Sequence, residues 1–361
     1  MQMHLINSWN NDKFSEQLFA KSCINMKKPP ILWLNVSLFT ITFLVAAVGT
    51  PLYLFYQGFS WGLFTAFAAL AIYAGISITA GYHRLWSHRA WDGHWSVRLF
   101  FALGGALALQ NSILHWASDH REHHKHVDHK DNDPYSISRG FWFAHIGWML
   151  REYHEHRYND YSNVKDLQKD KIVMWQHKYY LPLMLFMNVG VPLLIGLALG
   201  QVWGALLIAG FLRLVIGHHT TFFINSLAHV WGKQTFTDRN SARDNGWIAL
   251  LTYGEGYHNF HHIFSGDYRN GIRWYHFDPS KWLIRAFSWV GLAKNLKKAN
   301  PYQIEKARLE MKIKRVVAKK PWLAERLHEE YEVILAEMQA YYQTQKQWLT
   351  RRKQIQRQLR A

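Results

Sequence analysis

The chain has 361 residues, a formal net charge of +17 and a single cysteine, Cys23. One cysteine excludes internal disulfides and a cysteine-ligated iron–sulfur cluster. The many Lys and Arg residues accompany no nucleic-acid-binding motif and flank apolar stretches, so we predict an anionic lipid surface, not a nucleic acid, as their partner.

The first apolar stretch follows a polar N-terminal segment, residues 1–30, which we predict to be cytosolic because it lacks the apolar run of a cleavable signal peptide. No Asp, Glu, Lys or Arg occurs from residue 29 to 83. A membrane crossing needs about 20 residues, so two crossings fit, at about 31–56 and 61–80. A short turn at 57–60 joins them.

A second uncharged stretch begins after Lys178, and we predict crossings at about 178–200 and 202–222. Arg213 falls inside the fourth crossing, where we expect it to face the bundle interior, unless that crossing starts earlier. Neither turn carries a Lys or Arg, which places both termini on the cytosolic side. These patterns predict an all-α integral membrane protein with four transmembrane helices in two hairpins.

Between the hairpins, residues 97–114 are apolar but contain Arg98 and two adjacent glycines, so we predict an interfacial or buried helix there. The second and fourth crossings are predicted to continue beyond the bilayer into a cytosolic helical cap. Residues 291–361 alternate Lys and Arg with Glu and apolar residues, which predicts a basic helical tail on the membrane surface.

Two boxes of the same spacing dominate the polar segments: His120-Arg121-Glu122-His123-His124 and His258-Asn259-Phe260-His261-His262. Positions i, i+3 and i+4 share one face of a helix, so each box is expected to present three imidazoles to one point. With three further histidines the set exceeds the four or five ligands of one first-row ion, which predicts a dimetal site in the cap. A catalytic site facing lipid-derived substrates favours iron. The candidate ligands are His83, His88, His120, His123, His124, His229, His258, His261 and His262.

Two of these assignments depend on local helix geometry. His83 and His88 are five residues apart, about 140° around an ideal helix, so they share a metal only if the helix ends or distorts between them. Asn225 lies four residues before His229 on the same face and is predicted to hold a metal-bound water. His126 is not expected to be a ligand, and His218 and His219 are expected to be hydrogen-bonded inside the bundle.

Six segments of the chain form a recognisable series: His83-Arg84-Leu85-Trp86-Ser87-His88, Asp119 to Lys125, Asp133-Pro134, Arg139 to Trp148, Asn225-Ser226-Leu227-Ala228-His229 and Gly254 to His262. In this order they resemble the membrane-bound acyl-CoA Δ9 desaturases of the stearoyl-CoA type, over about residues 30–290. A further segment, Phe277-Asp278-Pro279-Ser280-Lys281-Trp282, is similar to the bacterial branch of that family, which implies a bacterial inner membrane as the location.

The resemblance implies an O2-dependent enzyme with two iron ions that introduces a cis double bond, at Δ9, into a saturated C16–C18 acyl chain. It assigns the nine histidines as iron ligands and Asn225 as the residue that holds a water. It also implies substrate contacts from Gln110, Trp116, Asp119 and Thr221. The substrate would be a long-chain acyl-CoA, and a separate electron donor, a b-type cytochrome, a ferredoxin or a reductase, would supply electrons.

Two departures bear on the acyl carrier. Animal members have an Arg-Lys pair where this chain has Arg151-Glu152, and the residue before Asp119 is Ser118 instead of a base. An acyl carrier protein or a membrane lipid therefore stays an alternative to CoA. A diiron alkane or fatty acid hydroxylase is the alternative reaction, and a zinc transporter is a remote one, because the predicted crossings offer few polar ligands.

Overall fold

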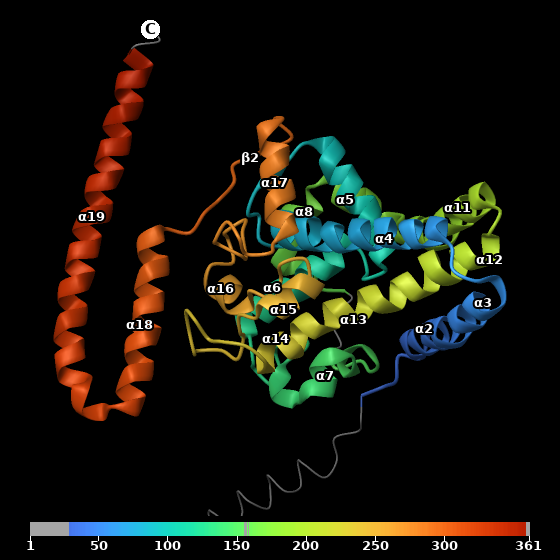
Figure 1. Ribbon diagram of the computed structural model, residues 1–361, viewed down its shortest axis with the longest axis horizontal. Coiled ribbons are helices and arrows are strands. Elements are labelled where there is room, and N and C mark those ends of the chain that lie inside the picture. Colours follow the sequence, from blue (N-terminus) through green and yellow to red (C-terminus); the bar gives the residue numbers. More distant parts are fainter. Residues whose placement is uncertain (1–28, 155–156, 158, 359–361) are drawn as a thin grey trace, which may run out of the picture.

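The computed structural model describes residues 29–154, 157 and 159–358, and these residues are mostly helical (Figure 1). All but the last two residues of the predicted cytosolic segment 1–30 lie outside the described residues, as does Cys23. Two short strands, β1 (Asp92–Gly93) and β2 (Ala293–Lys294), pair antiparallel and join distant parts of the chain.

Within the described residues, four helices are long and apolar enough to cross a membrane, as predicted for a multi-pass membrane protein. The second and fourth continue beyond the predicted ends at 80 and 222, as expected. A tight turn at Gly58 separates the first two, and Gly200 ends the third. The four helices are Trp33–Gln57, Trp61–Ser87, Tyr180–Leu199 and Val202–Val230.

Each of these long helices contains a π-helical segment, which lies between α-helical segments in three of them and ends the second. The first is α2 (Trp33–Leu44), η1 (Val45–Gly49) and α3 (Thr50–Gln57), and the second is α4 (Trp61–Ile76) and η2 (Ser77–Ser87). The third is α10 (Tyr180–Leu185), η6 (Phe186–Gly190) and α11 (Val191–Leu199). The fourth is α12 (Val202–Gly204), η7 (Ala205–Leu212), α13 (Arg213–Asn225) and α14 (Leu227–Val230).

The fourth helix lies at the centre of the bundle, because η7 packs against the other three long helices and α13 against α2 and α4 (Figure 1). Arg213 faces the bundle interior, as expected. It is 2% exposed and donates hydrogen bonds to the carbonyl of Leu107 at 2.8 Å and to Oδ1 of Asn188 at 2.6 Å. These acceptors satisfy a guanidinium that would otherwise be costly in apolar surroundings.

The segment between the two pairs of long helices folds as α5 (Trp95–Ala108) and α6 (Ile113–His126), which are bent by 80°. One face of α5 is buried against η2, so residues 97–114 contain a buried helix as predicted. The chain turns at Leu109 and Asn111, both with positive φ, and the Ser112 side chain caps the start of α6.

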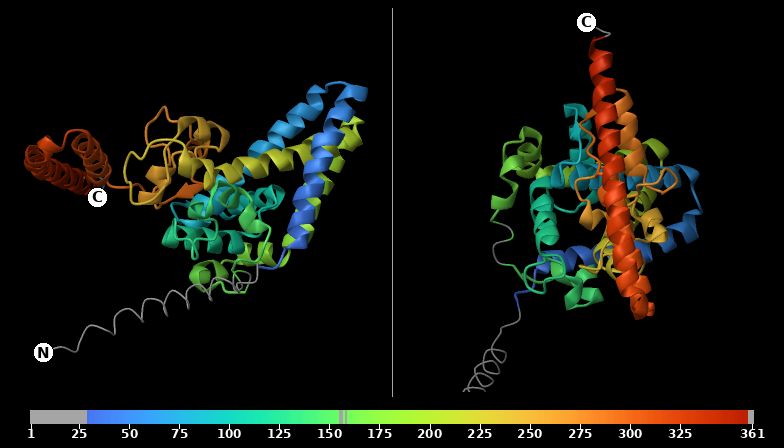
Figure 2. Two further views of the ribbon diagram at one scale, coloured as in Figure 1. Left: turned by 90° about the horizontal axis from the view of Figure 1, so that it is seen from below. Right: turned by 90° about the vertical axis from the view of Figure 1, so that its left-hand side faces the viewer.

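The remaining elements surround the end of the bundle where α6 lies. In Figure 2, the helical pair α18–α19 projects from the edge of the molecule opposite the turn between α11 and α12. The α-helices are α7 (Phe141–His145), α8 (Lys165–Gln168), α9 (Lys171–Lys178), α15 (Gly246–Leu251), α16 (His258–Ile263), α17 (Pro279–Trp289), α18 (Pro301–Lys319) and α19 (Ala324–Gln358). The 3₁₀ turns are η3 (Ile137–Arg139), η4 (Gly147–Met149), η5 (Ser162–Val164) and η8 (Pro321–Leu323).

Candidate metal centre

Four separate elements bring the nine candidate histidines together. The first box lies on α6 and the second on α16, so both are helical as predicted. His83 lies in η2, His88 caps that segment, and His229 lies on α14. These side chains converge although the boxes are more than a hundred residues apart in the chain.

The π-helical geometry of η2 explains how His83 and His88 reach one site. In a π-helix the backbone hydrogen bond joins residues five apart, and the N–H of His88 donates to the carbonyl of His83 at 3.0 Å. Residues five apart therefore lie nearly above one another, and the two imidazole centroids are 4.7 Å apart. The distortion that the spacing requires is present.

The structure divides the nine histidines into two groups, within each of which the ligand nitrogens lie within 4.8 Å of one another. Each box contributes to both groups, so the expectation that a box serves a single point is wrong. Positions i+3 and i+4 differ by about 100° around the helix, which lets i and i+4 face one group and i+3 the other. The first group is His83, His88, His120, His124 and His261; the second is His123, His229, His258 and His262.

The contacts inside each group fit metal ions better than hydrogen bonds. In the first group, Nε2 of His261 lies 3.0 Å from Nε2 of His83 and 2.9 Å from that of His124. Imidazole nitrogens bound to one ion at about 2.1 Å, the distance typical of zinc, lie roughly 2.9–3.4 Å apart at angles of about 90–110°. The spacing therefore leaves room for an ion between the rings.

The second group shows the same fit. Here the carboxylate of Asp133 indicates which ring nitrogen of His123 carries the hydrogen. The N–H at Nδ1 of His123 donates a hydrogen bond to Oδ1 of Asp133 at 2.9 Å, which leaves a lone pair on Nε2. That lone pair faces Nε2 of His262 at 3.3 Å. Nε2 of His258 also lies 3.2 Å from Nε2 of His229. Lone pairs directed at a common point are the arrangement that a cation stabilises.

Burial keeps these imidazoles in the state that binds metals. Burial is the largest cause of the lowered imidazole pKa, and electrostatic interaction with neighbouring histidines lowers the pKa further. The five rings named below are therefore neutral at pH 7, and each offers a lone pair. The pKa is lowered in this way for His120, His124, His258, His261 and His262.

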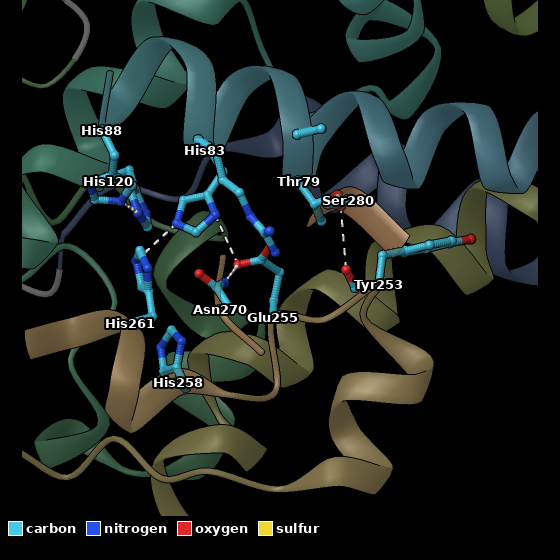
Figure 3. A network of polar contacts seen from close by, with 12 residues as sticks. Thr79, His83, His88, His120, Tyr253, Glu255, His258, His261, Asn270 and Ser280 are labelled. Carbon is cyan, nitrogen blue, oxygen red and sulfur yellow. Dashed lines mark hydrogen bonds and ion pairs between the residues drawn. The ribbon is translucent and has the colours of Figure 1, made fainter. Parts of the chain in front are cut away.

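A buried carboxylate network orients the first group (Figure 3). Glu255 is 3% exposed, and its Oε2 lies 2.8 Å from Nδ1 of His83. Its Oε1 accepts a hydrogen bond from Nη2 of Arg84 at 2.8 Å, and Asn270 donates to its Oε2 at 2.6 Å. Arg84 also pairs with Asp278 at 2.9 Å. The network fixes the ring of His83 with Nε2 toward the other ligands.

Replacing Asp133 with asparagine is expected to weaken metal binding by the second group about 10–100-fold, because outer partners of this kind orient the ligand ring. Asp133 is buried, and only His123 among the nine histidines contacts it. Iron per chain after dialysis against a graded chelator measures the effect. The matched control is Asp131→Asn, an exposed position two residues away. Equal iron retention in both variants would contradict the assigned role.

A mostly apolar cavity of about 480 Å³ reaches the metal centre from between the long helices. Its wall includes His83 and His120 of the first group and His123 and His258 of the second. Side chains of α2, α4, α13 and the third long helix also line it, among them Leu38. A long apolar ligand lying here would pass beside both groups.

The four predicted substrate-contact residues all line this cavity. Three of them are joined by hydrogen bonds. Gln110 donates to Oγ1 of Thr221 at 2.8 Å, and Nε1 of Trp116 donates to Oε1 of Gln110 at 3.3 Å. Trp116 also stacks on His120, with centroids 4.8 Å apart. The fourth residue, Asp119, lies where the apolar cavity meets a second, polar one.

The polar cavity, of about 380 Å³, is lined by Glu122, His126, His154 and Asp160 among others. It shares Asp119 and Arg157 with the apolar cavity. Nε of Arg157 donates to Oδ1 of Asp119 at 2.8 Å, and a second contact joins the guanidinium to Oδ2. No sequence signal identified Arg157, since the loop that carries it has no spacing related to Asp119.

Other histidines and Arg151 lie apart from the two groups. His126 lies 3.6 Å from Glu122 on the outer side of α6, His218 contacts the Leu109 carbonyl at 3.1 Å, and His219 contacts His145 at 3.0 Å. These contacts agree with the expected roles. Arg151 donates to the Pro29 carbonyl at 2.7 Å and so supports the start of the first long helix. Asn225 ends α13 and lines the apolar cavity, and its water remains a prediction.

A family model described as "Fatty acid desaturase" matches residues 59–289. The chain belongs to the fatty acid desaturase family. The matched residues include both histidine groups and three of the four long helices.

Three relatives of this desaturase-family chain have informative names. It is 46% identical to "Probable acyl-CoA desaturase" of Schizosaccharomyces pombe over 74% of this chain and 56% of that protein. It is 45% identical to "Acyl-CoA desaturase 1" of Saccharomyces cerevisiae over 68% of this chain and 48% of that protein. The chain thus spans about half the length of these two yeast relatives. It is also 36% identical to "Stearoyl-CoA desaturase 5" of Bos taurus, over 76% of this chain and 82% of the relative. These eukaryotic relatives do not support placement in the bacterial branch, which stays a prediction.

Proposed function

We propose that this chain is an O2-dependent fatty acyl desaturase that introduces a cis double bond at Δ9 of a saturated C16–C18 chain. The observation that carries the proposal is the apolar cavity whose wall includes histidines of both groups. The nine histidines would hold two iron ions, and Asn225 would hold a water at the second. The iron ions would supply the oxidising chemistry: one hydrogen from each of two adjacent methylenes, two protons and two electrons from a separate donor would reduce O2 to two water molecules.

The residues of the chain position the substrate and keep the site dry. Leu38, Ile78 and Leu214 line an apolar wall that excludes water from an acyl chain. The hydrogen-bonded chain of Thr221, Gln110 and Trp116 crosses that wall next to His120 and would place one methylene pair beside the metals. The double-bond position then depends on the distance from this point to the polar head of the substrate.

The polar cavity supports an acyl carrier bound at the open end, and acyl-CoA is the carrier we propose. The Arg157–Asp119 pair lies between the two cavities and offers a guanidinium to a thioester carbonyl or a phosphate. The relatives named as acyl-CoA desaturases support the same choice. A relative from Nostoc named "sn-2 palmitoyl-lipid 9-desaturase", 34% identical over 76% of this chain and 93% of that protein, keeps a lipid-bound chain as the alternative.

For the membrane arrangement we propose two helical hairpins with both termini and the metal centre on the cytosolic side. The turns at residues 57–60 and 200–201 carry no Lys or Arg, whereas the segments that surround the metal centre carry many. A bacterial inner membrane remains our prediction for its location. The desaturase domain is taken as 31–290 and the basic tail as 291–361.

Replacing Gly217 with leucine is expected to lower activity on C18 chains about tenfold more than on shorter chains. Gly217 lines the apolar cavity, and a Cβ built there meets nothing within 4 Å, so the new side chain would fill cavity space without disturbing α13. Competition between saturated chains of different length measures the ratio. The control is Gly246→Leu, which also adds a side chain in open space but outside the cavity. An unchanged ratio in Gly217→Leu would place the acyl chain elsewhere.

Expression of the gene in a host with a compatible electron donor tests the proposed function. We expect cis-monounsaturated C16 and C18 chains to rise and their saturated precursors to fall, as measured by gas chromatography with location of the double bond. A hydroxylated product would favour the hydroxylase alternative. Purified protein supplied separately with acyl-CoA, acyl carrier protein thioester or phospholipid then identifies the carrier.

A further inference from the structure

The C-terminal helix α19 exposes an apolar stripe with a strict seven-residue repeat. The helix is otherwise mostly polar. The residues at this spacing are Leu327, Ile334, Tyr341, Trp348 and Ile355. The last four are 40%, 60%, 58% and 56% exposed. An α-helix has about 3.6 residues per turn, so residues seven apart differ by only about 20° around the helix and the five residues form one longitudinal stripe.

The partner helix α18 covers a different face of α19. Leu335 is 7% exposed, and the ring of Tyr342 lies 6.0 Å from that of Tyr302 at the start of α18. Because α18 has 19 residues and α19 has 35, the second half of α19 extends beyond its partner. Within the described residues, no element covers the stripe at Tyr341, Trp348 or Ile355.

The charges of α19 are segregated along its length on either side of Tyr341. Residues 324–340 contain five Glu and one Arg, whereas residues 342–358 contain five Lys and Arg and no Asp or Glu. Two parallel copies would place like charges together. Two antiparallel copies centred on Tyr341 would place the acidic half of each against the basic half of the other.

We propose that α19 pairs antiparallel with α19 of a second copy of this chain, about a two-fold axis at Tyr341. In this register Ile334 faces Trp348, Leu327 faces Ile355, and Glu330 faces Arg352. Every apolar residue of the stripe then meets an apolar residue. The helix is about 50 Å long at 1.5 Å per residue, so the five residues of the stripe are spread over most of its length.

The alternative occupant of the stripe is the membrane surface, which suits it less well. Five Glu residues in the first half of α19 would meet the negative potential of anionic lipids. In Figure 2, moreover, α18 and α19 lie at the edge of the molecule opposite the turn between the third and fourth long helices. A second copy would offer opposite charges to both the acidic and the basic half of α19, whereas an anionic membrane would attract the basic half alone.

Cysteine cross-linking of the full chain in detergent tests the pairing and its direction. In a Cys23→Ser background, Tyr341→Cys is expected to form a disulfide-linked dimer, because only a residue on the axis brings the two Cα atoms within about 7 Å. Gln339→Cys, which points to the opposite side of the helix, is the control and should stay monomeric. Ile334→Cys and Trp348→Cys should cross-link when mixed but not alone.

Several results would overturn the proposal. They are the absence of a Tyr341→Cys dimer, equal cross-linking of Gln339→Cys, or cross-linking of Trp348→Cys alone, which would mean parallel pairing. Charge reversal gives an independent reading without cysteines. Arg352→Glu should raise the dimer dissociation constant about tenfold, and Glu330→Arg in the same chain should restore it. Lys312→Glu on α18 is the control, and failure of the second substitution to restore pairing would refute the register.

Discussion

Replacing His124 or His262 with alanine is expected to abolish desaturation and to reduce bound iron. His124 belongs to the five-histidine group and His262 to the four-histidine group, so each substitution removes one nitrogen from a different site. Nε2 of His124 lies 2.9 Å from that of His261, and Nε2 of His262 lies 3.0 Å from that of His258. Loss of either ring leaves its neighbours without the geometry that holds an ion.

Iron per chain and product formation, measured on the same purified samples, separate this expectation from simple misfolding. The control is His126→Ala, which lies on the same helix two residues beyond His124 but contacts Glu122 at 3.6 Å instead of another ligand. It should keep both iron and activity. Equal loss in all three variants would mean that the ligand set is wrong, whereas loss of one iron in each ligand variant would support two separate sites.

The nine candidate ligands can be predicted from the sequence because helical spacing and histidine count are local properties. How the nine are shared between two sites cannot be predicted in this way. His120 and His124 face one group and His123 the other, and this depends on how α6 and α16 are rotated toward each other. That rotation follows from packing between segments far apart in the chain.

The π-helical segment η2 shows the same limit at one position. The sequence indicates that His83 and His88 need a distortion to share a site, but nothing in residues 77–87 specifies which distortion. The structure supplies a π-helix whose i to i+5 hydrogen bond aligns the two rings. Apolar crossings are predictable for a simpler reason, since about 20 consecutive uncharged residues have few other stable locations.

The carboxylates that support the histidines are partly predictable from the sequence. Asp133 and Glu255 occur inside recognisable segments, yet their partners, His123 and His83, lie 10 and 172 residues away in the chain. Buried carboxylates are rarely left unpaired, so their presence next to histidine boxes is a usable signal for an outer shell. Which histidine each supports emerges only from the fold.

Replacing Glu255 with glutamine is expected to lower the free energy of unfolding by about 3 kcal/mol, the usual scale for breaking a buried ion pair. Glu255 contacts His83, Arg84 and Asn270 with two oxygens, and all four residues are buried. Burial alone would raise the pKa of Glu255, but its contacts with His83 and Arg84 lower the pKa below its usual value, so the side chain is ionised at pH 7. The amide removes that charge and leaves Asp278 as the carboxylate that pairs with Arg84.

The same substitution should also weaken metal binding by the first histidine group about 10–100-fold, because the ring of His83 loses the acceptor that orients it. Thermal unfolding and iron content, measured in detergent, give the two effects separately. Glu305→Gln is the control: this glutamate pairs with Arg308 on the surface of α18, and its loss should cost about 0.5 kcal/mol or less and leave iron unchanged. Lower stability with normal iron would assign Glu255 to the Arg84 network alone, whereas lower iron with normal stability would make His83 its essential partner.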